Sequence, residues 1–100
     1  MSAIRLADIR ARIADLAVPD GADAIVVGRD AASIAAAALV AGGRDLDLLP
    51  YRIEDGLALC DGLAAGWRVV VLAPAGHQRA LGLLVERAGA EVLAALELPA

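Results

Sequence analysis

The amino-acid sequence predicts a single α/β domain in which helices cover both faces of a four-stranded parallel sheet. Short apolar runs that are typical of buried strands alternate with segments that have the length and composition of helices. Hydrophobic residues make up 60% of the chain, above the usual share of about 45–50%, and a sheet buried on both faces accounts for part of this excess. The length of 100 residues allows one core. We therefore expect residues 1–100 to form one domain of three layers.

The first half of the chain predicts a helix, a strand and a second helix. Residues 3–17 carry apolar and charged residues at helical spacing on opposite faces, so we expect an amphipathic helix, within residues 1–20, that packs on the core. Ala24–Gly28 is a continuous apolar run with β-branched residues and predicts a buried parallel strand. Asp30 is suited to cap the next helix, Ala31–Ala41, which is apolar nearly all round.

The middle of the chain predicts a weaker strand and a third helix. Asp45–Tyr51 has strand character, and Pro50 places it at an edge of the sheet or at the end of its strand. Glu54–Ala65 is helical by composition, although Gly56 and Gly62 both have low helix propensity.

The last third predicts a strand, a helix and a strand. Arg68–Ala73 is the strongest strand pattern of the chain, and a turn at residues 74–76 separates it from a helix over His77–Ala88. Glu91–Leu98 predicts the final strand. Because strands joined by helices pair in parallel through right-handed crossovers, the expected arrangement is Rossmann-like. We predict the strand order 2-1-3-4, which reverses between the first and third strands.

Charge and rare residue types exclude several classes of partner. The net charge is −4, the nine basic residues are all arginines, and Tyr51 and Trp67 are the only aromatic residues. Nucleic-acid surfaces need a basic footprint and usually stacking rings, so we expect no nucleic-acid partner. Neither a secretion signal nor an apolar stretch of the roughly 18–20 residues in a membrane span is present, so we expect no membrane partner. The lone Cys60, interpreted as a small buried residue, favours a cytoplasmic location.

Polar residues gather in the loops after the predicted strands, where parallel sheets bind ligands. Two of these loops also open helices, whose free backbone N–H groups favour anions. A phosphate or carboxylate held near Arg29, Ser33 and Arg79 is therefore a physically sensible hypothesis. The candidate ligand-binding residues are Arg29, Asp30, Ser33, Gly76, His77, Gln78 and Arg79.

Each candidate also has a plainer interpretation. Asp30 and Ser33 can serve as ordinary helix-capping residues, and Arg29 and Arg79 can be surface residues. His77, the only histidine, is a weak candidate for catalysis, and a nucleophile–base pair with Ser33 would need direct contact. We expect no metal site, because one histidine and one distant cysteine supply too few ligands. No GxGxxG or GK[ST] pattern is present, and we expect no cofactor.

Two segments of the second half resemble type I phosphoribosyltransferases, with the adenine and orotate enzymes nearest. They are Gly66–Leu72 with the turn after it and Leu83–Val92, and the ending Leu96–Pro99 looks like the tail strand of the adenine enzyme. In that family this strand leads into the loop that binds phosphoribosyl pyrophosphate. Ala24–Gly28 with the alanine-rich helix after it is similar to the family's strand–loop–helix, whose loop holds the pyrophosphate. The resemblance covers about residues 22–99 and implies a phosphoribosyltransferase-like core.

The chain departs from the family's pattern at the substrate signature. Ala73-Pro74 stands where the family has two adjacent acids that engage the ribose hydroxyls. The short loop Ala75–Gln78 has no Ser or Thr to wrap the 5′-phosphate. The resemblance therefore implies a truncated relative that lacks this signature and has lost catalysis. Of the family's binding positions, only the one near Arg29–Asp30 carries over.

Two functions are consistent with these observations. The leading hypothesis is a non-catalytic, phosphoribosyltransferase-like binding or assembly module that holds a phosphate-bearing small molecule at the carboxyl-end rim of the sheet. The alternative is a small enzyme for a phosphorylated or carboxylated metabolite, with His77 as acid or base and Arg29 and Arg79 as an anion clamp. The apolar excess predicts a homodimer or another protein partner, with Ala31–Ala41 or the N-terminal helix as the contact surface.

Overall fold

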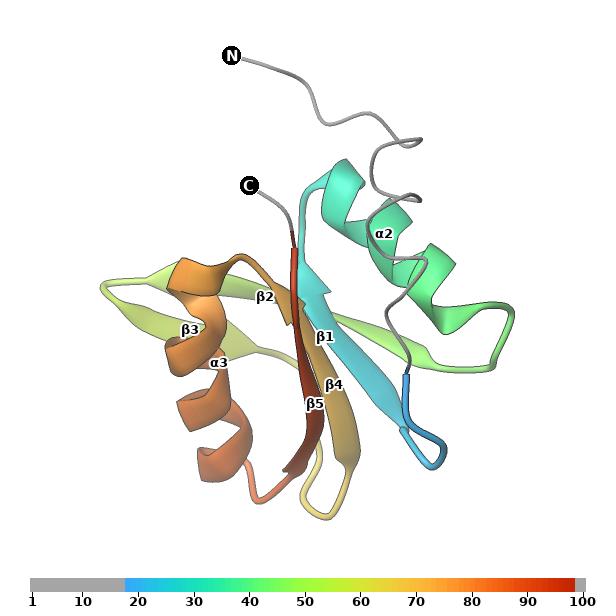
Figure 1. Cartoon of the computed structure of the whole chain (residues 1–100). Coiled ribbons are helices and arrows are strands. Elements are labelled where there is room, and N and C mark those ends of the chain that lie inside the picture. The colour runs from blue at the N-terminus through green and yellow to red at the C-terminus, as the bar shows by residue number, and fades with distance from the viewer. Residues whose placement is uncertain (1–17, 99–100) are drawn as a thin grey trace.

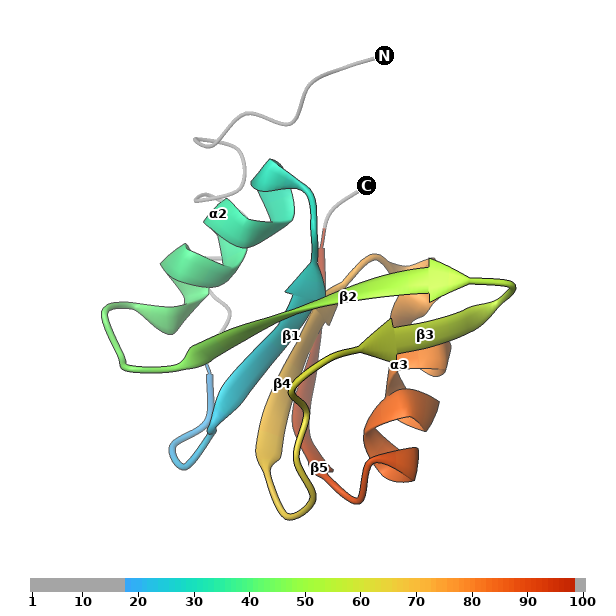
Figure 2. The same cartoon turned by 180° about the vertical axis from the view of Figure 1, so that it is seen from behind.

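Residues 18–98 of the computed structural model form a mixed β-sheet with a helix on each face (Figures 1 and 2). The elements are β1 (Ala24–Gly28), α2 (Ala31–Ala41), β2 (Asp47–Glu54), β3 (Leu57–Cys60), β4 (Arg68–Ala73), α3 (Ala75–Arg87) and β5 (Glu91–Glu97). The five strands lie in the order β3-β2-β1-β4-β5. β1 pairs in parallel with β2 and with β4, and β4 pairs in parallel with β5. The structure describes residues 18–98, and the helix predicted over residues 3–17 lies outside them.

The expected four-stranded, all-parallel sheet of order 2-1-3-4 is wrong, because β3 adds a fifth, antiparallel strand beside β2. The segment Glu54–Ala65, predicted as a helix, instead turns back on β2 as a hairpin. Asp55 and Gly56 both have positive φ, +52° and +76°, as two-residue hairpin turns require. Aspartate tolerates this left-handed region better than most residues, and glycine adopts it freely. The Asp-Gly turn therefore overrides the helical composition around it.

Most other elements match the sequence pattern. β1, α2 and β4 begin and end at the predicted residues. α2 is capped by Asp30 and ends at Gly42, whose φ of +60° and N–H bond to the Leu39 carbonyl are typical of a helix C-terminus. α3 begins at Ala75, two residues before its predicted start. These boundaries are set by capping and turn residues, which can be recognised in the sequence.

The sheet has an apolar core on each face. Side chains of β4 alternate between them, because Val70 and Leu72 pack in the core under α2 whereas Val69 and Val71 pack in the core under α3. Leu81 of α3 is fully buried, and full burial of a leucine side chain stabilises a fold by about 1.5–3 kcal/mol. The first core comprises Val18, Ile25, Val27, Ala36, Ala37, Val40, Ala41, Val70, Leu72 and Leu98. The second comprises Ala24, Val26, Tyr51, Ala58, Val69, Val71, Ala73, Leu81 and Val85.

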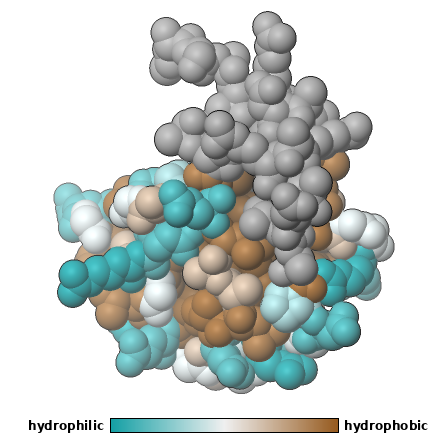
Figure 3. All heavy atoms as spheres, viewed as in Figure 1, coloured by the Kyte–Doolittle hydropathy of each residue, from teal (hydrophilic) through white to brown (hydrophobic). Residues whose placement is uncertain are grey.

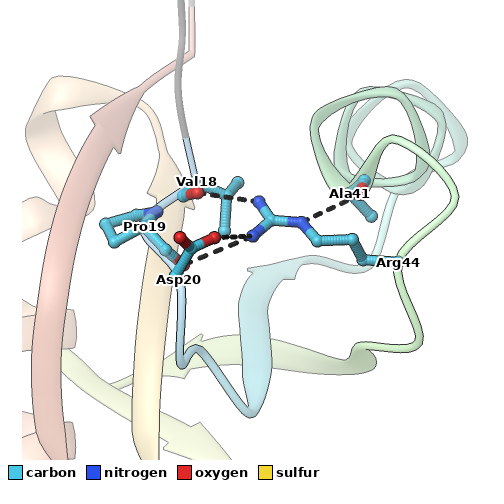
Figure 4. A network of polar contacts seen from close by, with 5 residues as sticks. All are labelled: Val18, Pro19, Asp20, Ala41 and Arg44. Atoms are coloured by element: carbon cyan, nitrogen blue, oxygen red, sulfur yellow. Dashed lines mark hydrogen bonds and ion pairs between the residues drawn. The ribbon is translucent and has the colours of Figure 1, made fainter.

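Arg44 joins the end of α2 to the segment that leads into β1 (Figure 4). Its Nη2 donates to the Val18 carbonyl at 2.8 Å and its Nε to the Ala41 carbonyl at 3.4 Å. An oxygen of the Asp20 carboxylate lies 3.7 Å from Nη1. A cation beside the last carbonyls of a helix is favourable. Arg44 thus has a structural role at the amino-end rim of the sheet, away from the rim where parallel sheets bind ligands.

The two helical crossovers start from the neighbouring central strands β1 and β4 and run toward opposite edges of the sheet. From β1 the chain passes through α2 to β2, and from the neighbouring β4 it passes through α3, on the other face, to β5. The carboxyl ends of β1 and β4 therefore form the switch point, where the strand order reverses and where ligands bind in such sheets. Among residues 18–98, neither helix is long and apolar enough to cross a membrane.

Candidate functional site

The candidate residues of the sequence analysis come directly after β1 and β4 and gather at the starts of α2 and α3. Arg29 and Asp30 lie between β1 and α2, and Ser33 lies in the first turn of α2. Gly76, His77, Gln78 and Arg79 lie in the first two turns of α3. The two helices begin in different ways.

The start of α2 is filled by a carboxylate of the chain itself. Asp30 accepts the backbone N–H of Ser33 at 3.0 Å and the Ser33 hydroxyl at 2.7 Å. The hydrogen bond from the Ser33 side chain lowers the pKa of Asp30 from its ordinary value, against the opposing effect of burial. A Cβ at Gly28 would lie 3.0 Å from the Asp30 carboxylate and 3.1 Å from the Ser33 hydroxyl oxygen. Glycine at this position therefore leaves room for the cap.

The start of α3 has no such side chain. Pro74 occupies the N-cap position with φ −58° and ψ 154° and offers no side-chain hydrogen bond. The His77 N–H bonds to the Pro74 carbonyl at 3.0 Å. Within residues 18–98, the N–H groups of Ala75 and Gly76 have no hydrogen-bond acceptor. Two backbone donors and the positive end of the α3 dipole are thus left unneutralised at the switch point.

His77 is held at this position by Tyr51, a residue that sequence reasoning missed. The Tyr51 hydroxyl lies 2.7 Å from His77 Nδ1, and the two rings meet edge to face at 87°. Tyr51 is only 5% exposed, and burial, followed by the nearby charge of Asp30, raises the pKa of its hydroxyl. The hydroxyl therefore keeps its hydrogen, which it can donate to Nδ1 of the Nε2–H tautomer. In this arrangement the neutral imidazole carries its hydrogen on Nε2.

Gln78 connects α3 to the ends of two strands. Its Nε2 donates to the Ala73 carbonyl of β4 at 2.8 Å and to the Leu96 carbonyl of β5 at 2.9 Å. These two acceptors fix the orientation of the amide, because the opposite orientation would place oxygen against oxygen. Gln78 Oε1 is buried and has no partner within the described residues. The contacts of Gln78 hold the start of α3 in place, which is a structural role.

The two arginines proposed as an anion clamp belong to different crossovers, Arg29 to the loop before α2 and Arg79 to α3. Arg29 lines an open depression of about 370 Å³ together with Arg52, Glu54 and Asp61. Arg52 is paired there with Glu54 at 2.9 Å and with Asp61 at 3.8 Å. Arg79 is exposed on α3, on the opposite side of the sheet from α2. Within the described part of the chain, neither Arg29 nor Arg79 forms an ion pair.

Two further sequence hypotheses concern nucleophiles. Ser33 donates its hydroxyl to Asp30 and makes no hydrogen bond with His77 within residues 18–98. Cys60 is half-buried against the core under α3. Burial and then the Asp61 charge raise the pKa of the Cys60 thiol, which keeps it protonated and poorly reactive. Within the described residues, no three histidine, cysteine, aspartate or glutamate side chains come close enough together to hold a metal ion.

Comparisons with protein-family models, with curated proteins and with solved structures find no significant match. The resemblance to type I phosphoribosyltransferases therefore stays a prediction.

Proposed function

We propose that the chain is a non-catalytic binding module that holds the phosphate group of a small molecule against the start of α3. One observation carries this proposal: at the switch point, the α2 terminus is occupied by Asp30, whereas the α3 terminus has no capping side chain. A ligand anion has a natural place only at the second terminus, because a fixed carboxylate would repel it at the first.

The chemistry of the α3 terminus suits phosphate. The Ala75 and Gly76 N–H groups and the helix dipole favour an anion. The Nε2–H of His77 supplies a third donor, since Tyr51 occupies Nδ1. Arg79, one turn further along α3, is exposed and long enough to approach a bound anion. The resemblance to type I phosphoribosyltransferases supports a phosphoribosyl compound as the ligand class, and the lone cysteine supports a cytoplasmic location.

A thermal-shift comparison of matched ligands tests this proposal. We expect ribose 5-phosphate, phosphoribosyl pyrophosphate and inorganic phosphate to raise the melting temperature, because each binds the native state alone. Unphosphorylated ribose is the matched control and should leave the melting temperature unchanged. If ribose and ribose 5-phosphate raise the melting temperature equally, or if neither raises it at millimolar concentration, the chain has no phosphate site.

The second candidate function is an enzyme that uses His77 as an acid or base. The Tyr51–His77 hydrogen bond favours it, because a fixed imidazole tautomer is what proton transfer requires. The substrate would be a phosphorylated or carboxylated metabolite. Turnover of phosphate esters, monitored by phosphorus NMR, should then disappear in His77→Gln while the protein stays folded. If no ester is turned over by the wild-type chain, the binding role is favoured.

A further inference from the structure

Exposed apolar side chains of residues 18–98 concentrate at the tip of the β2–β3 hairpin and on α3. Of the four large hydrophobic residues that are exposed, three lie there: Ile53 at 37%, Leu57 at 52% and Leu83 at 51%. Ile53 pairs with Ala58 across the hairpin, so both side chains lie on the sheet face that α3 covers. Leu57 instead pairs with Glu54 beside the turn, and it is linked to α3 by the groove that it lines together with Leu83. We call Ile53, Leu57 and Leu83 the hairpin–α3 patch.

A groove runs between the two parts of this patch, where the hairpin and α3 lie side by side (Figures 1 and 2). It has a volume of about 120 Å³, and its lining is mostly apolar. The lining residues are Gly56, Leu57, Ala58, Ala80, Leu83 and Arg87. A groove of this size accommodates one aliphatic side chain.

The charges around the groove are arranged for contact with a second copy of the same surface. Asp55 stands at the hairpin turn, and Arg87 is the last residue of α3. Neither forms an ion pair within the described residues, since the acids that pair with Arg52 are Glu54 and Asp61. A two-fold interface brings a surface against itself, so it needs both signs of charge at separate places. This surface meets that condition.

We propose that the hairpin–α3 patch is the interface of a two-fold homodimer. Leu57 and Leu83 of the two copies pack together along the grooves, and Arg87 of each copy pairs with Asp55 of the other. The surface is distinct from the start of α3, where the phosphate is proposed to bind. The dimer and the phosphate site can therefore fail independently.

The outer edge of β5 is a weaker candidate for self-association. Hydrophobic residues gather in the centre of the face shown in Figure 3, which includes β5, and Val92 of this strand is 37% exposed. However, Glu91 and Glu97 stand at the two ends of β5. Antiparallel pairing with a second copy about Ala94 would place each Glu91 opposite Glu97 of the other copy. Like charges in such positions oppose pairing, and natural edge strands use them to prevent it.

Sedimentation velocity of the full chain over a range of concentrations tests the dimer. We expect a monomer–dimer equilibrium, and we expect Leu83→Glu and Leu57→Glu each to raise the dissociation constant by about tenfold or more, because each places a charge in an apolar interface. Val92→Thr is the matched control, since it removes an exposed apolar group outside the patch. It should leave the dissociation constant unchanged.

A double-mutant cycle tests the pairing of Asp55 with Arg87. Both side chains are exposed, so the variants should fold. Asp55→Asn keeps a residue that tolerates the left-handed turn and should weaken dimerisation about twofold by removing the attraction. Arg87→Glu should weaken it more, because two acids then meet. In the Arg87→Glu background, Asp55→Asn should strengthen dimerisation. A strictly monomeric wild type, a dimer that both leucine variants leave intact, or an Asp55→Asn effect of the same sign in both backgrounds would overturn the proposal.

Discussion

The two helices that open at the switch point begin at the same backbone geometry and differ in what neutralises them. The N-cap residues have nearly equal dihedral angles, φ −71° and ψ 154° at Asp30 and φ −58° and ψ 154° at Pro74. At α2 the Asp30 carboxylate accepts two hydrogen bonds from Ser33. At α3 the cap has no side-chain acceptor. The difference indicates that one terminus serves stability and the other is free to bind an anion.

The neighbours of each terminus reinforce this division. Gly28 leaves space for the Asp30 cap, which makes the α2 start a self-contained turn. At α3, Tyr51 instead forms a hydrogen bond with His77 in the first turn of the helix. The side chain of Gln78 attaches the same turn to the sheet through the Ala73 and Leu96 carbonyls. Free N–H groups at the start of a helix are the arrangement that anion-binding helices use.

The largest expected effect comes from removing one backbone donor at each helix start in turn. Proline is tolerated at the first helical position, and the extended ψ of Asp30 and Pro74 suits a following proline. Ala75→Pro should weaken phosphate binding by about tenfold or more, as expected for a lost hydrogen bond to a charged group of about 1.5–3 kcal/mol. The matched Ala31→Pro should not. Calorimetric titration with inorganic phosphate measures both, and equal losses in the two variants would remove the distinction between the termini.

A smaller effect should result from removing the carboxylate that fills α2. Asp30→Ala should lower the free energy of unfolding by about 0.5–2 kcal/mol through loss of the cap, measured by denaturant titration. Because the folded-state pKa of Asp30 is lowered, its stabilising contribution is present above the ordinary aspartate pKa and is lost as the pH falls through the folded value.

Asp30→Asn is the control for this prediction, since asparagine also caps helices but carries no charge. This variant should keep most of the wild-type free energy of unfolding at neutral pH. It should lack the part of the acid-induced loss of stability that comes from protonation of Asp30. If Asp30→Ala is as stable as the wild type, the carboxylate does not hold the α2 start.

The smallest effect concerns the hydroxyl of Tyr51 at the start of α3. Tyr51→Phe removes the hydroxyl bonded to His77 and should cost about 0.5–1.5 kcal/mol at neutral pH. The raised pKa of Tyr51 means that its contribution is present below the ordinary tyrosine pKa of about 10 and is lost as the pH rises through the folded value. As the pH rises into the alkaline range, the free energy of unfolding should therefore fall further in the wild type than in Tyr51→Phe.

The chain suits this alkaline measurement because it contains no lysine and a single tyrosine. The Cys60 thiol, whose pKa is also raised, titrates nearby, so both proteins should carry Cys60→Ser. Equal alkaline losses in the two proteins would show that the Tyr51 hydroxyl does not contribute.

Local signals in the sequence predicted the parts of the fold that local chemistry determines. The apolar run Ala24–Gly28 and the Asp30 cap gave the start of the domain correctly, because burial and capping act on adjacent residues. The helix expected over Glu54–Ala65 was wrong, although Asp55-Gly56 is the strongest short-range hairpin signal. The prediction gave more weight to the helix-favouring composition of the segment than to Asp55 and Gly56, whose positive φ angles form the turn.

The candidate site was only partly accessible to sequence reasoning. The positions of the loops after β1 and β4 are set by strand order, so Asp30, Ser33 and His77 could be found. Tyr51 could not, because its contact with His77 joins residues 26 positions apart and depends on how α3 packs on β2. The placement of Arg29 and Arg79 likewise depends on which sheet face each helix covers.

We propose that phosphate binds at the start of α3 and not at the start of α2. Titration of the isotope-labelled chain with inorganic phosphate, monitored through amide chemical shifts, distinguishes the two helix starts. We predict that the Ala75 and Gly76 amide signals shift with a common saturation curve while those of Ala31 and Ala32 stay in place. Shifts at Ala31 and Ala32 without shifts at Ala75 and Gly76, or no saturable shift at either helix, would contradict the claim.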